Sequence, residues 1–446
     1  MTVAEFRAVL MKELDARAEE IQTRSQAGIE QYRKRAHKLR ILDKDGKPVV
    51  GVKVSIDQKT HDFKFGANIF MLDGFADPEV NRRYRETFPR YFNFATLPFF
   101  WDGVEPEKGK PRYEIGSPKV SRRPPADLCM LFCEENGILP KIHCLCYDKM
   151  IPDWLPKQDK EAMWELYEKR FREISERYAG RMYEIEVTNE LVSSHKWTNC
   201  SILANEPDTD LRMFEMARRY FPQDKLLVHD CELSDVGRFG CRSPYYLQIH
   251  DLLRRGAQID KIGVQNHIFM GVSGDQAADL PTFARHFIVD RLYNGLKTLS
   301  SFGKPIGITE VTIPTLGDES LEAEQLQADM LRVLYTIWFS SPLMDSISYW
   351  NLADYTAITV PGWDENNCRG GIFHADMTPK LAALELYRLI HEEWHTKLEL
   401  VTDAEGYVNF RGFYGDYIAE TNQESIHFGI HKGGLQQTNY RRGDNL

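Results

Sequence analysis

The stretch Tyr183-Glu-Ile-Glu-Val-Thr-Asn-Glu190 decides the fold, and Pro305-Ile-Gly-Ile-Thr-Glu310 has the same pattern. Each is a largely apolar run that stops at a glutamate, which is typical of a buried strand in a parallel sheet. When such strands close into a barrel, their carboxyl ends meet at one mouth, where barrel enzymes place their functional side chains. The two stretches therefore predict strands that deliver Glu190 and Glu310 to a common site.

Outward from these stretches, eight apolar runs of strand length can be counted. Segments with helical periodicity separate them, for example 161–178 and 322–340. Strands that alternate with long helices indicate βαβ units and a parallel sheet. The expected fold is therefore α/β, a (β/α)8 barrel. Its candidate strands are 63–70, 92–100, 139–147, 183–191, 225–233, 261–269, 305–313 and 346–354.

The two chain ends are expected to form a small β-rich unit beside the barrel. Residues 3–38 have apolar side chains at helical spacing, and an alternating hairpin of 38–42 and 49–56 follows. Short runs between turns from residue 398 onward could pair with that hairpin. Such a unit would close off the barrel ends, with a separate sugar-binding module as the alternative. The expected domains are 1–59, 60–395 and 396–446.

Composition argues against several classes of protein. A net charge of −10 and a pI near 5.8 give no basic surface for nucleic acid. No apolar run is long enough to span a membrane, and the first residues lack the pattern of a signal peptide. We expect a cytoplasmic chain without a membrane partner, or a secreted or periplasmic one if a signal peptide had been removed. Eight scattered cysteines favour a reduced compartment.

Polar and aromatic side chains fall near the ends of most predicted strands. Two long irregular segments, 103–124 and 355–378, would overhang the same face and shape a cleft. Two carboxylates at one mouth suit hydrolysis of a glycosidic bond, because one can protonate the leaving oxygen while the other attacks or orients water. This chemistry needs no metal or cofactor, and we expect none. The candidate residues are Trp101, His143, Asp148, Asn189, Glu190, Gln265, His267, Glu310 and Trp350.

Motifs on six of these strands occur in a recognisable order. They are Phe65-Gly-Ala, Phe92-Asn-Phe-Ala-Thr followed by Trp101-Asp-Gly-Val-Glu-Pro-Glu-Lys-Gly, His143 with Pro152-Asp-Trp154, Val187-Thr-Asn-Glu190, Ile262-Gly-Val-Gln-Asn-His267 and Ile308-Thr-Glu310. Over about residues 60–395 the chain resembles glycoside hydrolase family 10, the xylanase family of retaining (β/α)8 hydrolases.

The resemblance implies a carbohydrate substrate and specific roles for the candidate residues. Glu190 would be the acid/base and Glu310 the nucleophile, with a carboxylate separation of about 5–5.5 Å. Four polar side chains would surround the sugar at the cleavage point, and two tryptophans would offer flat faces for stacking. These six are Asn189, His143, Gln265, His267, Trp101 and Trp350.

Departures from the family pattern cluster on the second and third strands. Where these xylanases typically have Glu-Asn-x-x-Lys-Trp, the chain has Thr96-Leu-Pro-Phe-Phe-Trp101, and the usual Trp-His reads Tyr147-Asp148. A site built to hydrogen-bond hydroxyl groups discriminates poorly once those groups are replaced by Leu97 and Phe100. We therefore expect a decorated oligosaccharide or small glycoside, with Tyr147 and Asp148 among the substrate-binding residues. Cleavage of plain xylan by an endo-β-1,4-xylanase is the alternative.

Two other classes remain open from the sequence. A catalytically dead binding barrel is disfavoured because both glutamates are present. A metal-dependent hydrolase would need ligand-type side chains, and His391-Glu-Glu-Trp-His395 matches a zinc signature on a predicted outer helix. Two surface histidines beside a glutamate are the simpler interpretation of that motif. The ligand-type side chains at the strand ends are His143, Asp148, Asp230 and His267.

Overall fold

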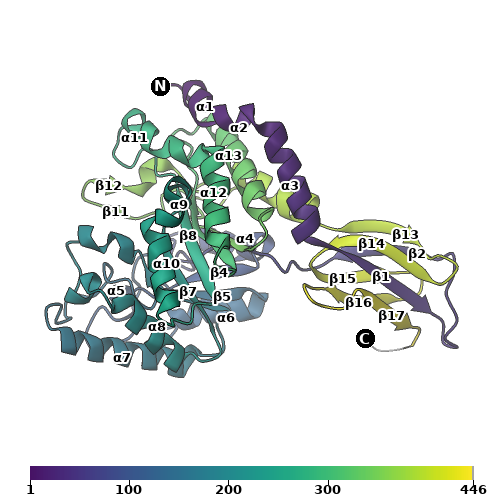
Figure 1. Cartoon of the computed structure of the whole chain (residues 1–446), viewed down its shortest axis with the longest axis horizontal. Coiled ribbons are helices and arrows are strands. Elements are labelled where there is room, and N and C mark those ends of the chain that lie inside the picture. The colour runs from purple at the N-terminus through teal and green to yellow at the C-terminus, as the bar shows by residue number, and fades with distance from the viewer. Residues whose placement is uncertain (444–446) are drawn as a thin grey trace.

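Within residues 1–443, which the computed structural model describes, eight parallel strands close into a barrel (Figure 1). The strands follow one another around the barrel in chain order, and β10 pairs with β3 to close it. Each overlaps a predicted strand, so the prediction of a (β/α)8 barrel is confirmed. The strands are β3 (Lys64–Asn68), β4 (Phe94–Pro98), β5 (Leu139–His143), β6 (Glu184–Asn189), β7 (Lys225–Glu232), β8 (Lys261–His267), β9 (Ile306–Thr312) and β10 (Met344–Tyr349).

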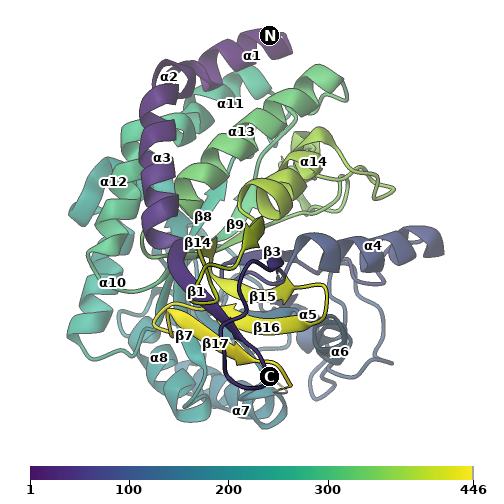
Figure 2. The same ribbon diagram turned by 90° about the vertical axis from the view of Figure 1, so that its right-hand side faces the viewer.

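Helices between the strands cover the barrel from outside (Figure 2). In α13, Leu326, Met330, Leu334 and Ile337 recur at three- or four-residue spacing and are buried. The helix starts at Ser320, whose hydroxyl accepts a hydrogen bond from the Ala323 amide. The helices are α4 (Pro78–Tyr91), α5 (Trp101–Val104), α6 (Ala126–Asn136), α7 (Lys160–Tyr178), α8 (Thr209–Tyr220), α9 (Leu233–Phe239), α10 (Pro244–Arg254), α11 (Gln276–Phe283), α12 (Val289–Ser300), α13 (Leu321–Phe339) and α14 (Leu381–Arg388).

Shorter helical turns and one small hairpin complete the barrel. The hairpin lies in the segment after β10, and a π-helical turn extends α14. These elements are η1 (Leu191–Lys196), η2 (Ile202–Asn205), η3 (Gly240–Arg242), η4 (Ala284–Phe287), η5 (Glu365–Cys368), η6 (Leu389–Glu393), β11 (Thr359–Val360) and β12 (Trp363–Asp364).

The barrel interior contains ion pairs as well as apolar side chains. Lys261 Nζ lies 2.7 Å from Glu184 Oε2, and Lys141 Nζ lies 2.9 Å from Glu186 Oε2. All four side chains are buried. Glu184 and Glu186 are two residues apart on β6, so their side chains point to the same face of the strand. A buried charge is tolerated when it is paired in this way. These pairs form the layers beneath the mouth.

A β-sandwich forms from the two ends of the chain. One sheet has the order β14-β1-β17 and the other β13-β2-β15-β16. Apolar residues from both sheets, among them Leu39, Ile56, Phe410 and Tyr417, form one core between them. The prediction that the terminal segments build a β-rich accessory unit is confirmed. The strands are β1 (Lys34–Leu42), β2 (Lys53–Gln58), β13 (Lys397–Val401), β14 (Tyr407–Phe413), β15 (Gly415–Glu420), β16 (Ser425–Ile430) and β17 (Gln437–Arg441).

The predicted N-terminal hairpin forms only at its turn, where Leu42 makes an antiparallel bridge to Pro48 and the Val49 amide donates to the Ile41 carbonyl. Strand β1 pairs with β14 and β17, whereas β2 pairs with β13 and β15, so the two strands lie in different sheets. Alternation of apolar side chains shows which face of a strand is buried, but not which strand it pairs with. The segment before β1 is also divided into α1 (Val3–Leu10), α2 (Lys12–Ala16) and α3 (Ala18–Tyr32) rather than one helix.

The sandwich adjoins the end of the barrel where the strands begin. The Asp62 amide donates to the Tyr414 carbonyl, and the Asp62 carboxylate lies 2.9 Å from His431 Nδ1. Because Asp62 precedes β3, this contact is at the end of the barrel away from the mouth. None of the helices described within residues 1–443 is both long and apolar enough to cross a membrane.

Candidate active site

Glu310 lies on β9 near its carboxyl end and is buried, with 3% of its surface exposed. Its Oε2 is 2.9 Å from His267 Nε2, and His267 Nδ1 is in turn 2.9 Å from the Thr312 hydroxyl. Burial alone would raise the pKa of Glu310, but the hydrogen bond from His267 and the nearby His229 and His143 hold that pKa below its ordinary value. Oε1 of Glu310 has no hydrogen-bond partner among the described residues.

Glu190 directly follows β6 and is only partly buried. The Tyr147 hydroxyl donates to its Oε2 at 2.6 Å, and Gln265 Nε2 donates to its Oε1 at 2.9 Å. The Glu190 backbone has φ of 56°, a left-handed conformation that side-chain-bearing residues adopt mainly in turns and functional sites. Gln265 is the cross-strand partner of Glu310 on β8 and β9. Gln265 therefore connects the neighbourhoods of both glutamates.

The side chains beneath the mouth form a group that we name the barrel-floor cluster: His143, Glu186, His229 and Glu310. Glu186 Oε1 lies 2.8 Å from His143 Nδ1 and 2.9 Å from His229 Nδ1. Burial raises the pKa of Glu186, but the two histidines and Lys141 together hold it well below its ordinary value. Sequence reasoning missed Glu186 and His229. A charged residue inside an apolar strand was the available signal for Glu186.

Aromatic side chains form one wall of the mouth. Trp350 meets Phe70 with ring centroids 5.2 Å apart and His143 at 5.1 Å. Phe100 meets the His143 ring at 4.9 Å, and Tyr147 packs against the same group. We name Phe70, Phe100, Trp350 and Tyr147 the aromatic wall. Trp350, expected at the mouth from the sequence, lies there.

The apolar residues after the second strand do not all face the mouth. Only Phe100 of the expected apolar replacements joins the aromatic wall, whereas Leu97 and Phe99 are buried in the main core. The Phe99 ring meets Tyr178 of α7 at 5.3 Å. Side chains alternate along an extended chain, so Leu97 and Phe99 point toward the helices, whereas Pro98 and Phe100 point toward the mouth.

Trp101 and Asp148 also differ from their expected role in sugar binding. The Trp101 ring lies 4.8 Å from that of Tyr167 on α7, within the main core. Asp148 accepts hydrogen bonds from the Tyr167 hydroxyl at 2.8 Å and from the Ser201 amide at 2.6 Å. Burial raises the pKa of Asp148. Both residues hold α7 and the segment after β6 in place rather than facing the mouth.

The remaining polar candidates lie where the sequence suggested. Asn189 is buried at the end of β6, and its Oδ1 has no hydrogen-bond partner among the described residues. That oxygen could accept a hydrogen bond from a sugar hydroxyl. His143, Gln265 and His267 contribute from β5 and β8 as described above.

The two long irregular segments reach the mouth. Arg123 places its guanidinium 4.0 Å from the Phe100 ring centroid, and Arg122 donates to Asn351 Oδ1 at 2.9 Å. In the segment after β10, Trp363 is 39% exposed and meets the Phe269 ring at 5.6 Å. Phe269 in turn stacks on His267 at 4.5 Å. Trp363 is thus an exposed aromatic near the site that sequence reasoning missed.

The ligand sets considered from the sequence are not brought together. His391 packs on Tyr387, whereas His395 Nε2 lies 3.0 Å from Asp57 Oδ1 of β2. The π-helical turn η6 adds a residue per turn, so positions i and i+4 no longer share a face. Asp230 accepts a hydrogen bond from the Val192 amide at 2.8 Å instead of meeting Asp148.

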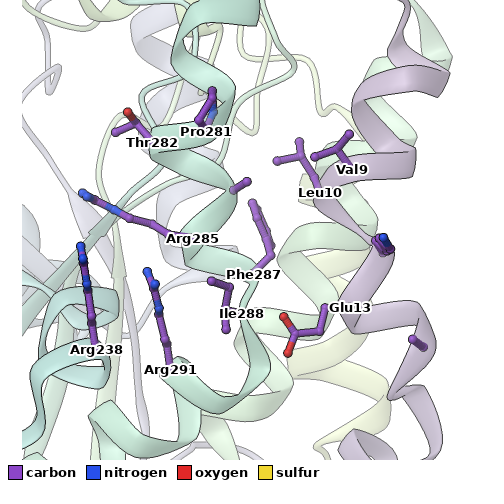
Figure 3. Close-up of a pocket in the computed structure, with 13 residues that line it drawn as sticks. Val9, Leu10, Glu13, Arg238, Pro281, Thr282, Arg285, Phe287, Ile288 and Arg291 are labelled. Carbon is purple, nitrogen blue, oxygen red and sulfur yellow. The ribbon is translucent and has the colours of Figure 1, made fainter.

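A cavity of about 820 Å³ lies on the outside of the barrel, against the N-terminal helices (Figure 3). Arg238, Arg285 and Arg291 lie on one side of it, and Val9 and Leu10 on the other. None of the candidate residues at the strand ends lines this cavity. It is therefore separate from the mouth.

A parallel barrel that carries one glutamate at the carboxyl end of each of two strands, here β6 and β9, is the arrangement of the barrel glycoside hydrolases. The sequence profile of Glycosyl hydrolase family 10 matches residues 75–387. The chain belongs to this family, as its motifs suggested.

Individual relatives are more distant. Endo-1,4-beta-xylanase 1 of Arabidopsis thaliana is 24% identical over 400 residues, covering 88% of this chain and 37% of the plant protein. Endo-1,4-beta-xylanase B of Thermotoga neapolitana is 24% identical, covering 74% of this chain and 88% of that protein. The native structure of xylanase 10B from Thermotoga maritima superposes with a TM-score of 0.58 at 22% identity, covering 74% and 97% of the two chains. The last comparison supports the shared fold.

The chain is shorter than several of its curated relatives. The chain spans about a third to a half of the length of several curated relatives that it matches, with 37%, 49% and 34% of three of them covered.

Proposed function

We propose that this chain hydrolyses a β-glycosidic bond with net retention of configuration, using Glu310 as the nucleophile and Glu190 as the acid/base. The observation that carries the proposal is the contrast between the two glutamates. Glu310 is buried and held by His267, whereas Glu190 is partly exposed and held by Tyr147 and Gln265. A nucleophile needs fixed orientation, and an acid/base must exchange protons with water.

The two steps follow from these positions. In the first, an oxygen of Glu310 bonds to the anomeric carbon while the bond to the leaving oxygen breaks, and Glu190 transfers its proton to that oxygen. In the second, Glu190 takes a proton from water as the water oxygen bonds to the anomeric carbon and releases Glu310. Oε2 of Glu310 is held by His267, so Oε1 is the oxygen left for attack.

For the substrate we propose a decorated oligosaccharide or a small glycoside with an apolar group. The aromatic wall supports this proposal, because the rings of Phe70, Phe100 and Trp350, which are 1%, 4% and 8% exposed, pack around the His143 ring where hydrogen-bonding groups would grip a plain sugar chain. The guanidinium groups of Arg122 and Arg123 lie 5.6 and 5.7 Å from the Phe70 ring centroid, and Arg123 is itself buried. Plain xylan is the second candidate, which the named xylanase relatives favour.

A substrate panel tests the choice. Xylan, short xylo- and gluco-oligosaccharides and glycosides with apolar aglycones are compared by kcat/KM, with Glu310→Ala as the blank. The proposal predicts that the small or decorated glycosides have the higher kcat/KM. Internal cleavage of xylan at a higher kcat/KM than every small glycoside would favour the second candidate.

One variant links the panel to the aromatic wall. Phe100→Ala should raise KM for apolar glycosides more than for unsubstituted oligosaccharides, because it removes apolar surface only from the wall. Phe239→Ala is the matched control, since this ring is 49% exposed on α9 and is not part of the mouth. An equal change in KM for both substrate types would argue against the assigned role of the wall.

A further inference from the structure

We propose that the barrel-floor cluster binds one transition-metal ion of the Zn²⁺ type, and that the bound ion reversibly blocks Glu310. The cluster gathers one ligand atom from each of four strands: Nδ1 of the two histidines and Oε1 of the two glutamates, all within 4.8 Å of one another. A metal site here departs from the expectation, drawn from the sequence, that the mouth binds no metal. The blocking effect of the ion rests on the proposed role of Glu310 as the nucleophile, whereas the affinity of the cluster for metal does not.

Two buried atoms in the cluster make no aligned hydrogen bond within the described residues. His143 Nδ1 is 2.8 Å from Glu186 Oε1 but makes no aligned hydrogen bond, and Glu310 Oε1 has no donor. The two residues are 1% and 3% exposed. A buried polar atom left without a partner costs about 1–3 kcal/mol. A cation between them would satisfy both atoms at once.

The distances fit a four-coordinate ion. The four histidine–glutamate separations are 2.8 and 2.9 Å to Glu186 and 3.8 and 3.6 Å to Glu310. Tetrahedral coordination with bonds of about 2.0–2.1 Å places neighbouring ligand atoms roughly 3.3 Å apart. The observed values lie on both sides of that spacing. The ligand atoms as a whole spread to 4.8 Å, so binding of the ion would draw the remaining pairs closer together.

The donor set also selects the kind of ion. Two imidazole nitrogens and two carboxylate oxygens suit Zn²⁺ and its neighbours Co²⁺ and Ni²⁺, whereas Ca²⁺ and Mg²⁺ prefer six or more oxygen ligands. Two carboxylates balance the charge of a divalent ion. Each carboxylate also has its second oxygen held, since Lys141 contacts Glu186 Oε2 and His267 contacts Glu310 Oε2, each at 2.9 Å. Such outer contacts orient metal ligands.

Metal binding and glycoside cleavage would then exclude each other. Oε2 of Glu310 is held by His267, and the ion would occupy Oε1, so neither oxygen could attack an anomeric carbon. The ion would sit below the sugar rather than at its leaving oxygen. Removal of the ion should restore the free nucleophile.

Calorimetric titration of the full-length, chelator-stripped protein with Zn²⁺ tests the site without any substrate. We expect one ion per chain. His229→Asn and His143→Gln should each weaken binding by more than the roughly 10–100-fold that loss of an outer contact causes. Glu190→Gln retains all four ligands and should bind as tightly as the unmodified chain. His391→Ala/His395→Ala is the matched control, because it removes two histidines outside the cluster and should change nothing.

A second measurement avoids dependence on the variants folding. Co²⁺ added to the unmodified protein should give the intense visible bands of a tetrahedral site. Absence of stoichiometric binding, weak bands of six-coordinate Co²⁺, or loss of binding only in the His391/His395 control would overturn the site.

Activity is then measured separately. The fraction of activity lost should equal the fraction of chains with Zn²⁺ bound, and a chelator should restore it. Full occupancy with unchanged activity would overturn the blocking effect. A protein that binds Zn²⁺ at the cluster but cleaves no glycoside at all would contradict the proposed function and leave the metal site standing.

Discussion

Replacing Tyr147 by phenylalanine tests how Glu190 is held. The substitution removes one hydroxyl, which donates to Glu190 Oε2 at 2.6 Å, and keeps the ring that packs in the aromatic wall. A hydrogen bond to a charged group contributes about 1.5–3 kcal/mol. If that energy orients the proton donor in the transition state, kcat/KM falls roughly 10- to 150-fold.

The loss should depend on the leaving group. In the proposed mechanism Glu190 protonates the leaving oxygen in the first step, and an activated aryl glycoside needs little protonation. We therefore expect Tyr147→Phe to affect poor leaving groups most and dinitrophenyl-type glycosides least, measured as kcat/KM across an aryl glycoside series. Tyr220→Phe is the matched control, because Tyr220 also donates to a glutamate, Glu168, but on the outer helices. An equal loss for all leaving groups would refute the reasoning.

Three further predictions concern other parts of the chain. Trp363→Ala should raise KM for oligosaccharides roughly 2- to 12-fold with little change in kcat, because a ring contact is worth about 0.5–1.5 kcal/mol. The Trp363 ring is 39% exposed near the mouth. An unchanged KM would exclude Trp363 from the site. His286 is fully buried, and burial together with Arg285 lowers its pKa from 6.5 to about 3, so the unfolded chain binds a proton that the folded chain does not. Urea unfolding should show stability falling by about 2 kcal/mol from pH 6.5 to pH 4.5, and a His286→Gln variant with the same slope would contradict this. Lys261→Met should destabilise the barrel by about 3–5 kcal/mol because it leaves Glu184 buried without its partner, and adding Glu184→Gln should recover much of that loss in the same unfolding assay.

The barrel could be predicted because its strands are apolar runs that end in polar residues. Stretches such as 183–190 and 305–310 are buried on both faces, and strands of that kind leave a clear signal in sequence. Their order around the barrel follows from the connections, since consecutive βα units place each strand beside the previous one. No comparable rule predicts the partners of β1 and β2. These strands pair with strands from the other end of the chain, which follow the whole barrel in sequence.

The site could be predicted where a motif fixes a strand end. Glu190, Gln265, His267 and Glu310 are gathered there because each lies at or beside the carboxyl end of its strand. Trp101 was misplaced because it begins α5, beyond the end of β4, and its ring packs on Tyr167 of α7.

Residues missed from the sequence had a different cause. His229 contacts the site only because β7 lies beside β6, and Trp363 only because a long segment folds back over β8. Neither position is marked by a local pattern. Contacts of this kind depend on tertiary packing, which single-strand periodicity does not describe.

Identification of the residue that bonds to the sugar tests the central claim most directly. The protein is incubated with an activated 2-deoxy-2-fluoro β-glycoside, which slows release of the glycosyl-enzyme, and the labelled peptide is located by mass spectrometry. The account predicts one sugar per chain, attached to the peptide that contains Glu310, and no labelling of Glu310→Ala. A sugar attached to Glu190, or to any peptide other than the one that contains Glu310, would contradict the assignment of the nucleophile.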